Sequence, residues 1–275
     1  MKNFILQLVV ICIIILGVLF NCFVSVSREP YDTALVYKDN EIDSNVLSEF
    51  EDCDIRAIEK EINELTKIKR AEEAALKKEE ERVESYESLQ KHLQSGKITL
   101  RQLFSDTYFA GDSLMHGLNS YGVLDSANMS TMVNASLYHL QDNISKIISN
   151  NPGNLVLHYG INMLVNTDSA RQSFIDLYES LLVHLKKELP DTKIFVSSIF
   201  NVSSKVQRQY PGIEDYNFAL SKMCKSIGVT FIDNNPILPG DETYYGGDGI
   251  HLSKEFYSAV WLPHLYFEMN LSDNN

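Results

Sequence analysis

Basic residues are few in this chain. Its 275 residues include 24 lysines and arginines against 37 aspartates and glutamates, which gives a formal net charge of −13. Proteins that bind nucleic acids neutralise phosphates with a basic surface, and attachment to anionic lipid through charge also needs Lys and Arg clusters. The composition therefore argues against a nucleic-acid partner and against peripheral binding to an anionic membrane surface.

Cysteine is also scarce. Of the four cysteines, Cys12 and Cys22 lie in an apolar tract, which leaves only Cys53 and Cys224, far apart in the chain. This set does not form the disulfide framework of a small secreted domain. The chain has no CxxC and no His/Cys cluster of the kind that binds zinc, so we expect neither a metal nor another cofactor. Hydrophobic residues make up 44% of the chain, enough for a real core in one large domain or two small ones.

The N-terminal region has no charged residue from Phe4 to Val26. As a helix this stretch would be roughly 35 Å long, enough to cross a hydrocarbon core of about 30 Å. The alternative is a cleaved signal peptide, but Ser25-Val26-Ser27 is a weak cleavage site. We therefore expect residues 4–26 to be a single-pass signal anchor. Lys2 on the short side places the rest of the protein on the extracytoplasmic side of the cell membrane by the positive-inside rule.

Residues 27–54 are polar, show no periodicity, and are predicted to be a linker. Residues 55–95 carry a heptad pattern in which eight of the twelve a and d positions are apolar, and they are predicted to form a helical stalk. One alternative is a coiled coil, which would make the protein a homo-oligomer. The other is a single solvated helix held by Glu/Lys pairs, and the polar seam residues Lys69, Glu72 and Glu79 favour it.

Strand-like and helix-like segments alternate from Leu103 onward. The strand-like runs are TYFAG, STMVNA, NLVLHYG, TKIFVSSIF and VTFID, and the helix-like stretches lie near residues 140–149, 169–188, 212–227 and 253–268. Repeated alternation of this kind indicates βαβ units around a parallel sheet. For residues 97–275 we expect an α/β fold, a flavodoxin-like three-layer sandwich with a five-stranded parallel sheet, in which ligands bind at the carboxyl ends of the strands.

Polar residues with matching chemistry follow several of these strands. Ser113 follows the first strand, Asn162 follows the third, and Asp248 and His251 lie together after the fifth. The Asp248 carboxylate would accept the imidazole Nδ1–H and leave Nε2 of His251 free to take a proton from Ser113. The backbone N–H groups of Ser113 and Ser136 and the side-chain amide of Asn162 would face the developing oxyanion. Each motif alone is weak, since GDS is also a turn with a helix cap, but their combination and order predict a serine hydrolase.

At these residues, from about Thr107 to Leu265, the chain resembles the GDSL/SGNH hydrolase family. The resemblance implies that Ser113 is the nucleophile, that Asp248 and His251 complete a catalytic triad, and that Asn162 donates to the oxyanion. Two positions depart from the family pattern. Met163 stands where the family usually has Asp, and Ser136 stands where it usually has an oxyanion glycine, so that a Cβ narrows the site and favours small acyl groups.

The resemblance and the expected export together imply a function. We expect a membrane-anchored serine esterase that removes O-acetyl groups from cell-envelope carbohydrate. A lipase or thioesterase is the alternative within the esterases, and a non-catalytic glycan-binding or scaffold module that keeps the fold is the alternative outside them. Tyr244 and Tyr245, just before the Asp248 loop, are candidates for a sugar-stacking wall or for the rim of the core. The segment 201–213 is a candidate lid over the site.

Overall fold

The computed structural model of the chain describes residues 55–238, 240 and 242–271. The predicted anchor, residues 4–26, and the predicted linker, residues 27–54, lie outside these residues, so both remain predictions. None of the helices in the described part of the chain has the length and apolar character needed to cross a membrane.

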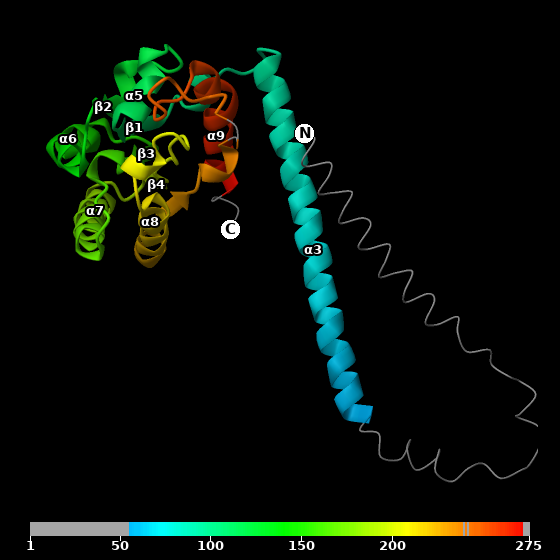
Figure 1. Cartoon of the computed structure of the whole chain (residues 1–275). Helices are drawn as coiled ribbons and strands as arrows, with labels where there is room; N and C mark the ends of the chain where they lie inside the picture. Colours follow the sequence, from blue (N-terminus) through cyan, green and yellow to red (C-terminus); the bar gives the residue numbers. More distant parts are fainter. Residues whose placement is uncertain (1–54, 239, 241, 272–275) are drawn as a thin grey trace, which may run out of the picture. The chain divides into compact units, whose positions relative to one another are not determined.

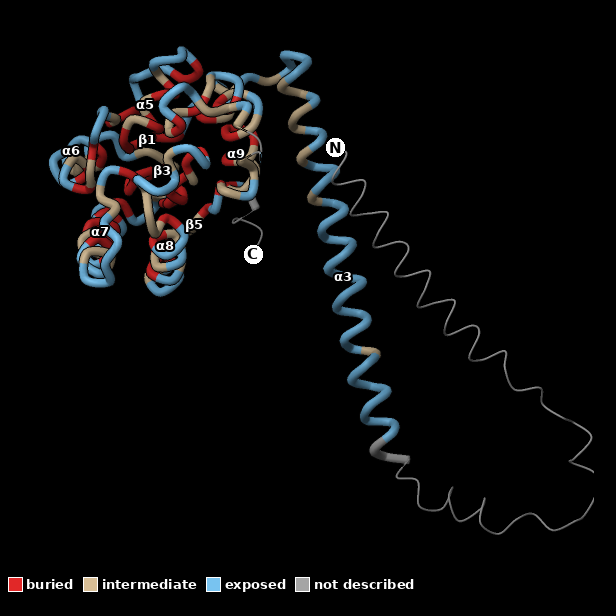
Figure 2. The backbone as a smooth tube through the Cα atoms, in the orientation of Figure 1, coloured by how far each residue is buried: buried red, intermediate tan, exposed pale blue. Residues whose placement is uncertain are grey.

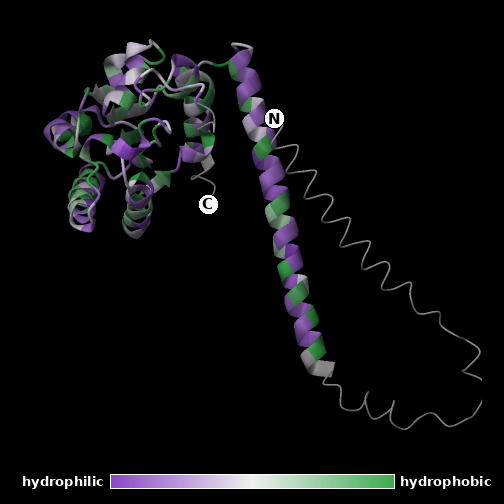
Figure 3. Ribbon diagram, viewed as in Figure 1, coloured by the Kyte–Doolittle hydropathy of each residue, from purple (hydrophilic) through white to green (hydrophobic). Residues whose placement is uncertain are grey.

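The chain divides into two compact units, Met1–Ala75 and Leu76–Asn275, with the boundary inside one long helix, α3 (Ile55–Gln94). In the first unit only residues 55–75 are described, and they are helical. Their apolar side chains Ile58, Ile62, Leu65 and Ile68 are each between 44% and 58% exposed. Figure 3 shows α3 as a mostly hydrophilic helix with hydrophobic positions at intervals along it. Both readings of the stalk stay open.

The second unit begins with the last part of α3 and continues into an α/β domain. Its elements, in chain order after α3, are α4 (Leu100–Leu103), β1 (Thr107–Gly111), α5 (Ser113–Ser120), η1 (Ser126–Asn128), β2 (Met129–Thr131), α6 (Leu137–Asn150), β3 (Asn154–His158), η2 (Ile161–Met163), α7 (Asp168–Glu188), β4 (Lys193–Ser197), η3 (Gln207–Gln209), α8 (Ile213–Ile227), β5 (Thr230–Ile232), η4 (Asn235–Ile237), η5 (Phe256–Trp261) and α9 (Leu262–Leu271).

The five strands form one sheet in the order β2-β1-β3-β4-β5, and every neighbouring pair is parallel. This is the strand order of flavodoxin-like sheets, and the predicted five-stranded parallel α/β fold is confirmed. Crossover connections between parallel strands are right-handed. The connection through α5 runs from β1 to β2, toward one edge of the sheet, whereas the connections through α6, α7 and α8 run toward the other edge. α5 therefore lies on the opposite face of the sheet from α6, α7 and α8. Figure 1 shows α6, α7 and α8 side by side, with α5 and α9 on the other side of the strands.

The core lies on both faces of this sheet. All five residues of β1 are buried, and so are the last four of β3 and of β4. Strands covered on both faces read as continuous apolar runs, and this is why TYFAG and NLVLH show no alternation in the sequence. In Figure 2 the buried residues gather on the strands and on the inner sides of the surrounding helices.

Several elements differ from the boundaries expected from the sequence. β3 ends at His158 rather than Gly160, and β4 ends at Ser197 rather than Phe200. The second strand ends at Thr131 rather than running through Ala135, because the chain turns there and Asn134 has a left-handed φ of 59°. The last helix is not uniform. It opens with the π-helical turns of η5, and the N–H of Leu262 donates to Tyr257 O. Pro263 follows, and since proline has no N–H, it cannot continue a regular α-helical ladder at this point.

Candidate active site

Ser113 is the first residue of α5 and is separated from β1, the strand beside the central strand of the sheet, by Asp112 alone. Asp112 caps the helix, with its Oδ1 accepting a hydrogen bond from Leu114 N–H at 3.0 Å. A Cβ on Gly111 would lie 2.5 Å from Met115 Cβ and 2.7 Å from His158 O, so only glycine fits where strand turns into helix. The turn presents Ser113 at the carboxyl end of the strand.

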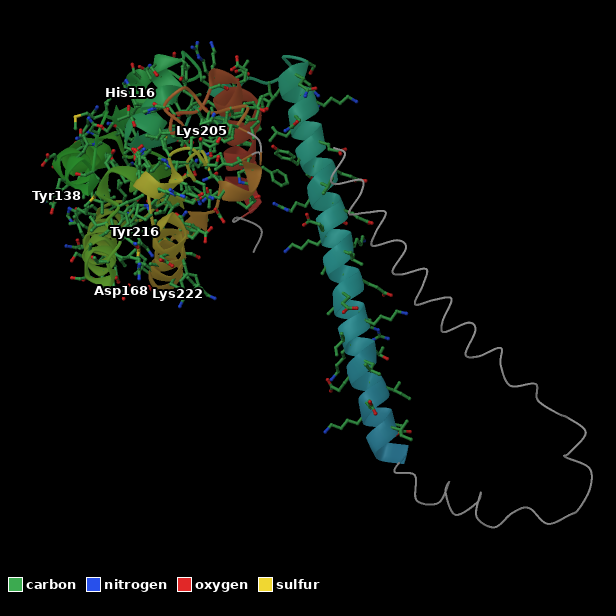
Figure 4. The ribbon with its side chains drawn as sticks, viewed as in Figure 1. His116, Tyr138, Asp168, Lys205, Tyr216 and Lys222 are labelled. Carbon is green, nitrogen blue, oxygen red and sulfur yellow. The ribbon has the colours of Figure 1, made fainter. Side chains whose placement is uncertain are left out.

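Asp248 and His251 lie on one loop between β5 and the last helix. The imidazole Nδ1 of His251 is 2.6 Å from Asp248 Oδ2, and its Nε2 is 2.9 Å from Ser113 Oγ. The structure thus brings together three side chains from segments 138 residues apart, in the connectivity of a Ser-His-Asp triad. Figure 4 draws the side chains of the described residues and labels His116, which follows Ser113 on α5.

The Asp248 carboxylate is held ionised. Burial by itself would raise its pKa. The hydrogen bonds from the His251 side chain and from the backbone N–H groups of Ile250 and His251 outweigh burial and lower the pKa to about 2. Both backbone bonds go to Oδ1, at 2.9 Å and 3.0 Å, which leaves Oδ2 for the imidazole. A carboxylate fixed in this way keeps Nδ1 of His251 protonated and directs Nε2 at Ser113.

The oxyanion candidates lie on the neighbouring loops. Asn162 is in η2, after β3, and its Nδ2 donates to the backbone O of Ala135 at 2.9 Å, which joins this loop to the one after β2. Since an amide nitrogen carries two N–H groups, one remains for a ligand. Ser136 is the N-cap of α6, with its Oγ accepting from Tyr138 N–H at 3.3 Å, so its hydroxyl is engaged in the helix start.

Two side chains have contacts that the sequence did not indicate. Met163 stands where an Asp was expected, and its sulfur accepts from Leu137 N–H at 3.3 Å, which again joins the β3 loop to α6. His116 on α5 is half-buried, with its Nδ1 3.1 Å from Thr131 Oγ1 at the end of β2. The loops that carry Ser113, Ser136 and Asn162 are therefore connected through side chains with no part in the triad.

A buried polar network lies where β3, β4 and β5 end. His158 Nδ1 is 2.9 Å from Ser197 Oγ, Asn234 Nδ2 donates to the same oxygen at 2.9 Å, and Trp261 Nε1 donates to Asn234 Oδ1 at 3.2 Å. Burial lowers the pKa of His158 to about 3, so this histidine is neutral and structural. The network joins three strand ends to the last helix, and paired polar groups of this kind make the surroundings rigid.

The tyrosines before the triad loop contribute to packing. Tyr245 donates its hydroxyl to Asn201 O at 2.7 Å, and the ring of Tyr244 lies 5.6 Å from that of Phe256. Both side chains are only partly exposed. Of the two readings that the sequence left open, these contacts favour the rim of the core over a free sugar-stacking wall.

No protein-family model matches the chain, and no curated protein matches its sequence. Several solved structures are similar to the chain. A lipase/acylhydrolase from Enterococcus faecalis is 13% identical, with 61% of this chain and 96% of that one covered and a TM-score of 0.47. A GDSL-like lipase from Bacteroides thetaiotaomicron is 11% identical over 69% of this chain and 100% of that one, with a TM-score of 0.45.

An acetylxylan esterase from Geobacillus stearothermophilus, in a catalytic-mutant form, is also similar. It is 11% identical, with 61% of this chain and 92% of that one covered and a TM-score of 0.43. Because these identities are low and the TM-scores lie below 0.5, the functional conclusion depends on the contacts around Ser113.

Proposed function

We propose that the protein is a serine esterase in which Ser113, His251 and Asp248 act as a catalytic triad. The observation that carries this proposal is the pair of contacts made by His251, 2.9 Å to Ser113 Oγ and 2.6 Å to Asp248 Oδ2. Ser113 Oγ attacks the ester carbonyl while Nε2 of His251 takes its proton, and Asp248 stabilises the imidazolium that forms. His251 then returns the proton to the leaving alcohol. In the second half, His251 activates a water that releases the acyl group from Ser113.

The oxyanion is stabilised by donors from three loops. Ser113 begins α5, and the N–H groups of a first helical turn point away from the helix toward the strand end. Asn162 contributes its second amide hydrogen, and Ser136 contributes its backbone N–H at the start of α6. Such donors are effective because they are already oriented when charge develops in the transition state.

The openness of the site favours a small acyl group on a large alcohol. The side chains of His251 and Asp248 are 41% and 49% exposed. Met132 leaves the sheet beside Gly111, where its N–H donates to Gly111 O at 3.2 Å, and the side chains of Met132 and Val133 are 50% and 55% exposed. A long acyl chain needs an enclosed apolar channel. An acetyl group needs little more than the triad and this exposed rim, and a bulky glycan can remain in solvent. We therefore propose O-acetylated cell-envelope carbohydrate as the substrate.

The proposed location depends on the uncharged stretch at residues 4–26. If this stretch is a membrane anchor with Lys2 on the cytoplasmic side, the esterase domain lies outside the cell membrane, where envelope glycans are. A lipase or thioesterase activity is the alternative for the same triad.

The test is acetate release from O-acetylated cell-wall glycan by the detergent-solubilised full chain. Wild type should release acetate, Ser113→Ala should not, and Ser149→Ala, which removes an exposed serine on α6, should behave as wild type. Activity on long-chain esters without acetate release would favour the lipase alternative. A folded wild-type protein inactive on every ester would leave the non-catalytic glycan-binding or scaffold module.

A further inference from the structure

The loop that carries Asp248 and His251 is closed at its base by its own hydrogen bonds. Tyr245 pairs with Leu252 in an antiparallel bridge, Gly246 N–H donates to His251 O at 2.7 Å, and Ser253 N–H donates to Tyr244 O at 2.7 Å. Asp248 lies at the far end of this loop, half-exposed. The tip is also bonded internally, with Gly249 N–H donating to Gly246 O at 3.0 Å. These bonds shape the loop, but the distance from the loop to Ser113 depends on contacts with other elements.

Such contacts come from the loop after β4. Ser203 N–H donates to Gly249 O at 2.8 Å, directly beside Asp248. Gly249 has a positive φ of 70°, and a Cβ there would lie 3.1 Å from Ser203 Cβ and 3.1 Å from Val206 Cγ2. At the base, the Tyr245 hydroxyl bonds Asn201 O. Segment 201–206, the front part of the predicted lid, therefore lies against the triad loop and is bonded to it.

One carboxylate joins the two loops. Glu242 Oε1 accepts from Ser203 Oγ at 2.8 Å and from Ser204 Oγ at 2.6 Å, and Oε2 pairs with the ammonium of Lys205. The backbone O of Glu242 accepts from Tyr245 N–H, so the same residue also begins the triad loop. Figure 4 labels Lys205 beside the orange segment that contains this loop.

Close packing covers only part of this interface between the loops. Ser203, Ser204, Glu242 and Tyr245 line a polar cavity of about 590 Å³. The hydrogen bonds of Glu242 to Ser203 and Ser204 therefore add to the backbone bond from Ser203 N–H to Gly249 O in joining the two loops. The hydrogen bonds from Lys205, Ser204 and Ser203 lower the pKa of Glu242 to about 2, so the carboxylate is charged over the range in which an esterase works.

We propose that Glu242 is a positioning residue for the triad: by binding Ser203, Ser204 and Lys205 it holds the Asp248–His251 loop at its working distance from Ser113. The predicted change in kcat rests on the esterase function proposed above. Glu242 touches none of the reacting atoms. Its loss should therefore lower kcat through a misplaced His251, while substrate binding at the open rim changes little.

The test compares Glu242→Ala with Glu214→Ala in the full chain, using a soluble acetyl ester. Glu214 lines the same cavity from the exposed first turn of α8 and makes no hydrogen bond or ion pair with the triad loop among the described residues, so it is the matched control. Glu242→Ala should lower kcat by about 10- to 100-fold, as expected for a small displacement of a catalytic group, with KM within about twofold. Glu214→Ala should match wild type. Wild-type kcat in a folded Glu242→Ala protein would overturn the proposal, as would a change in KM alone.

Amide hydrogen exchange keeps this test separate from that of the esterase function. Exchange in residues 243–251 should be faster in Glu242→Ala than in Glu214→Ala, with the rest of the domain unchanged. If wild type cleaves no ester, the esterase proposal fails, and equal exchange in the two variants would then refute the clamp by itself. Should Glu242→Ala not fold, Lys205→Ala changes an exposed partner of the same carboxylate. It should show smaller shifts in kcat and exchange in the same direction, and the absence of both would overturn the clamp.

Discussion

Among single residues outside the proposed triad, Asn162 is the one whose loss we expect to lower the rate most. Its amide contributes one N–H to Ala135 O and has a second for the charge that develops on the substrate oxygen. Loss of one oxyanion donor typically costs about 10² to 10³ in kcat. Asn162→Ala should therefore lower kcat by that order with little change in KM, as measured by steady-state kinetics on an acetyl ester.

Ser136 supplies the matched control for this prediction, because it lies in the same site and its hydroxyl caps α6. Ser136→Ala should leave kcat close to wild type while lowering the free energy of unfolding by about 1 kcal/mol through the lost cap. Ser136→Gly should keep or raise activity by relieving the crowding from Cβ. If Ser136→Ala removed as much activity as Asn162→Ala, the serine hydroxyl would be the working donor. An unchanged kcat in Asn162→Ala would remove Asn162 from the oxyanion site.

Asp112, next to the nucleophile, gives a prediction about pH. Burial raises its pKa from the ordinary 3.8 to about 7, against the hydrogen bonds from Leu114 and Met115 N–H that lower it. The folded state therefore holds this proton more tightly than the unfolded state. The resulting stabilisation is fully present below about pH 4 and is lost as pH rises to about 7, at about 1.4 kcal/mol per pH unit.

Asp112→Asn removes this titration and keeps an acceptor for the helix cap. Relative to wild type, the Tm of Asp112→Asn should rise by several degrees between pH 4 and pH 7, as measured by thermal unfolding at a series of pH values. Other titrating groups cancel in this difference. A Tm difference independent of pH would mean that Asp112 is ionised in the folded protein.

At the scale of secondary-structure elements, α3 tests the meaning of the heptad pattern. Its apolar positions from Ile58 to Ile68 are about half exposed, while Lys69, Glu72 and Glu79 interrupt the seam. We expect a single helix, so residues 40–275 and residues 76–275 should both sediment as monomers. The shorter fragment starts at Leu76 because Arg82 Nη2 contacts Glu268 at 2.6 Å and the Tyr86 ring packs on Phe267. An oligomer formed only by the longer fragment would establish the coiled coil.

The elements also show why sequence reasoning identified Ser113, Asp248 and His251 but missed the contacts of Glu242. TYFAG followed by GDS marks a strand, a turn and a helix within a few residues. Asp248 and His251 share one loop. Local sequence patterns therefore identified both the segment that contains Ser113 and the segment that contains Asp248 and His251. Glu242 bonds residues 37 to 39 positions away in the chain, in a segment with no periodicity. Such a contact depends on how two loops meet, and no local pattern predicts it.

For the whole molecule, the uncharged stretch at residues 4–26 gives a prediction about location. If it is a retained anchor, the full-length protein should stay in the membrane fraction after alkaline carbonate washing, with its N-terminus intact by mass spectrometry. Peripheral proteins are released by that wash and provide the control. A mature N-terminus near Arg28 in the medium would show that the stretch is a cleaved signal peptide.

The most direct test of the central claim is covalent labelling of the intact protein with a fluorophosphonate, followed by mass spectrometry of its peptides. An activated serine should react once, on the peptide that contains Ser113, because Nε2 of His251 lies 2.9 Å from its Oγ. Labelling should be lost in His251→Ala and retained in His116→Ala, which changes a histidine one helical turn beyond Ser113. No label on Ser113 in the folded wild-type protein, or labelling that persists in His251→Ala, would contradict a Ser113–His251–Asp248 triad.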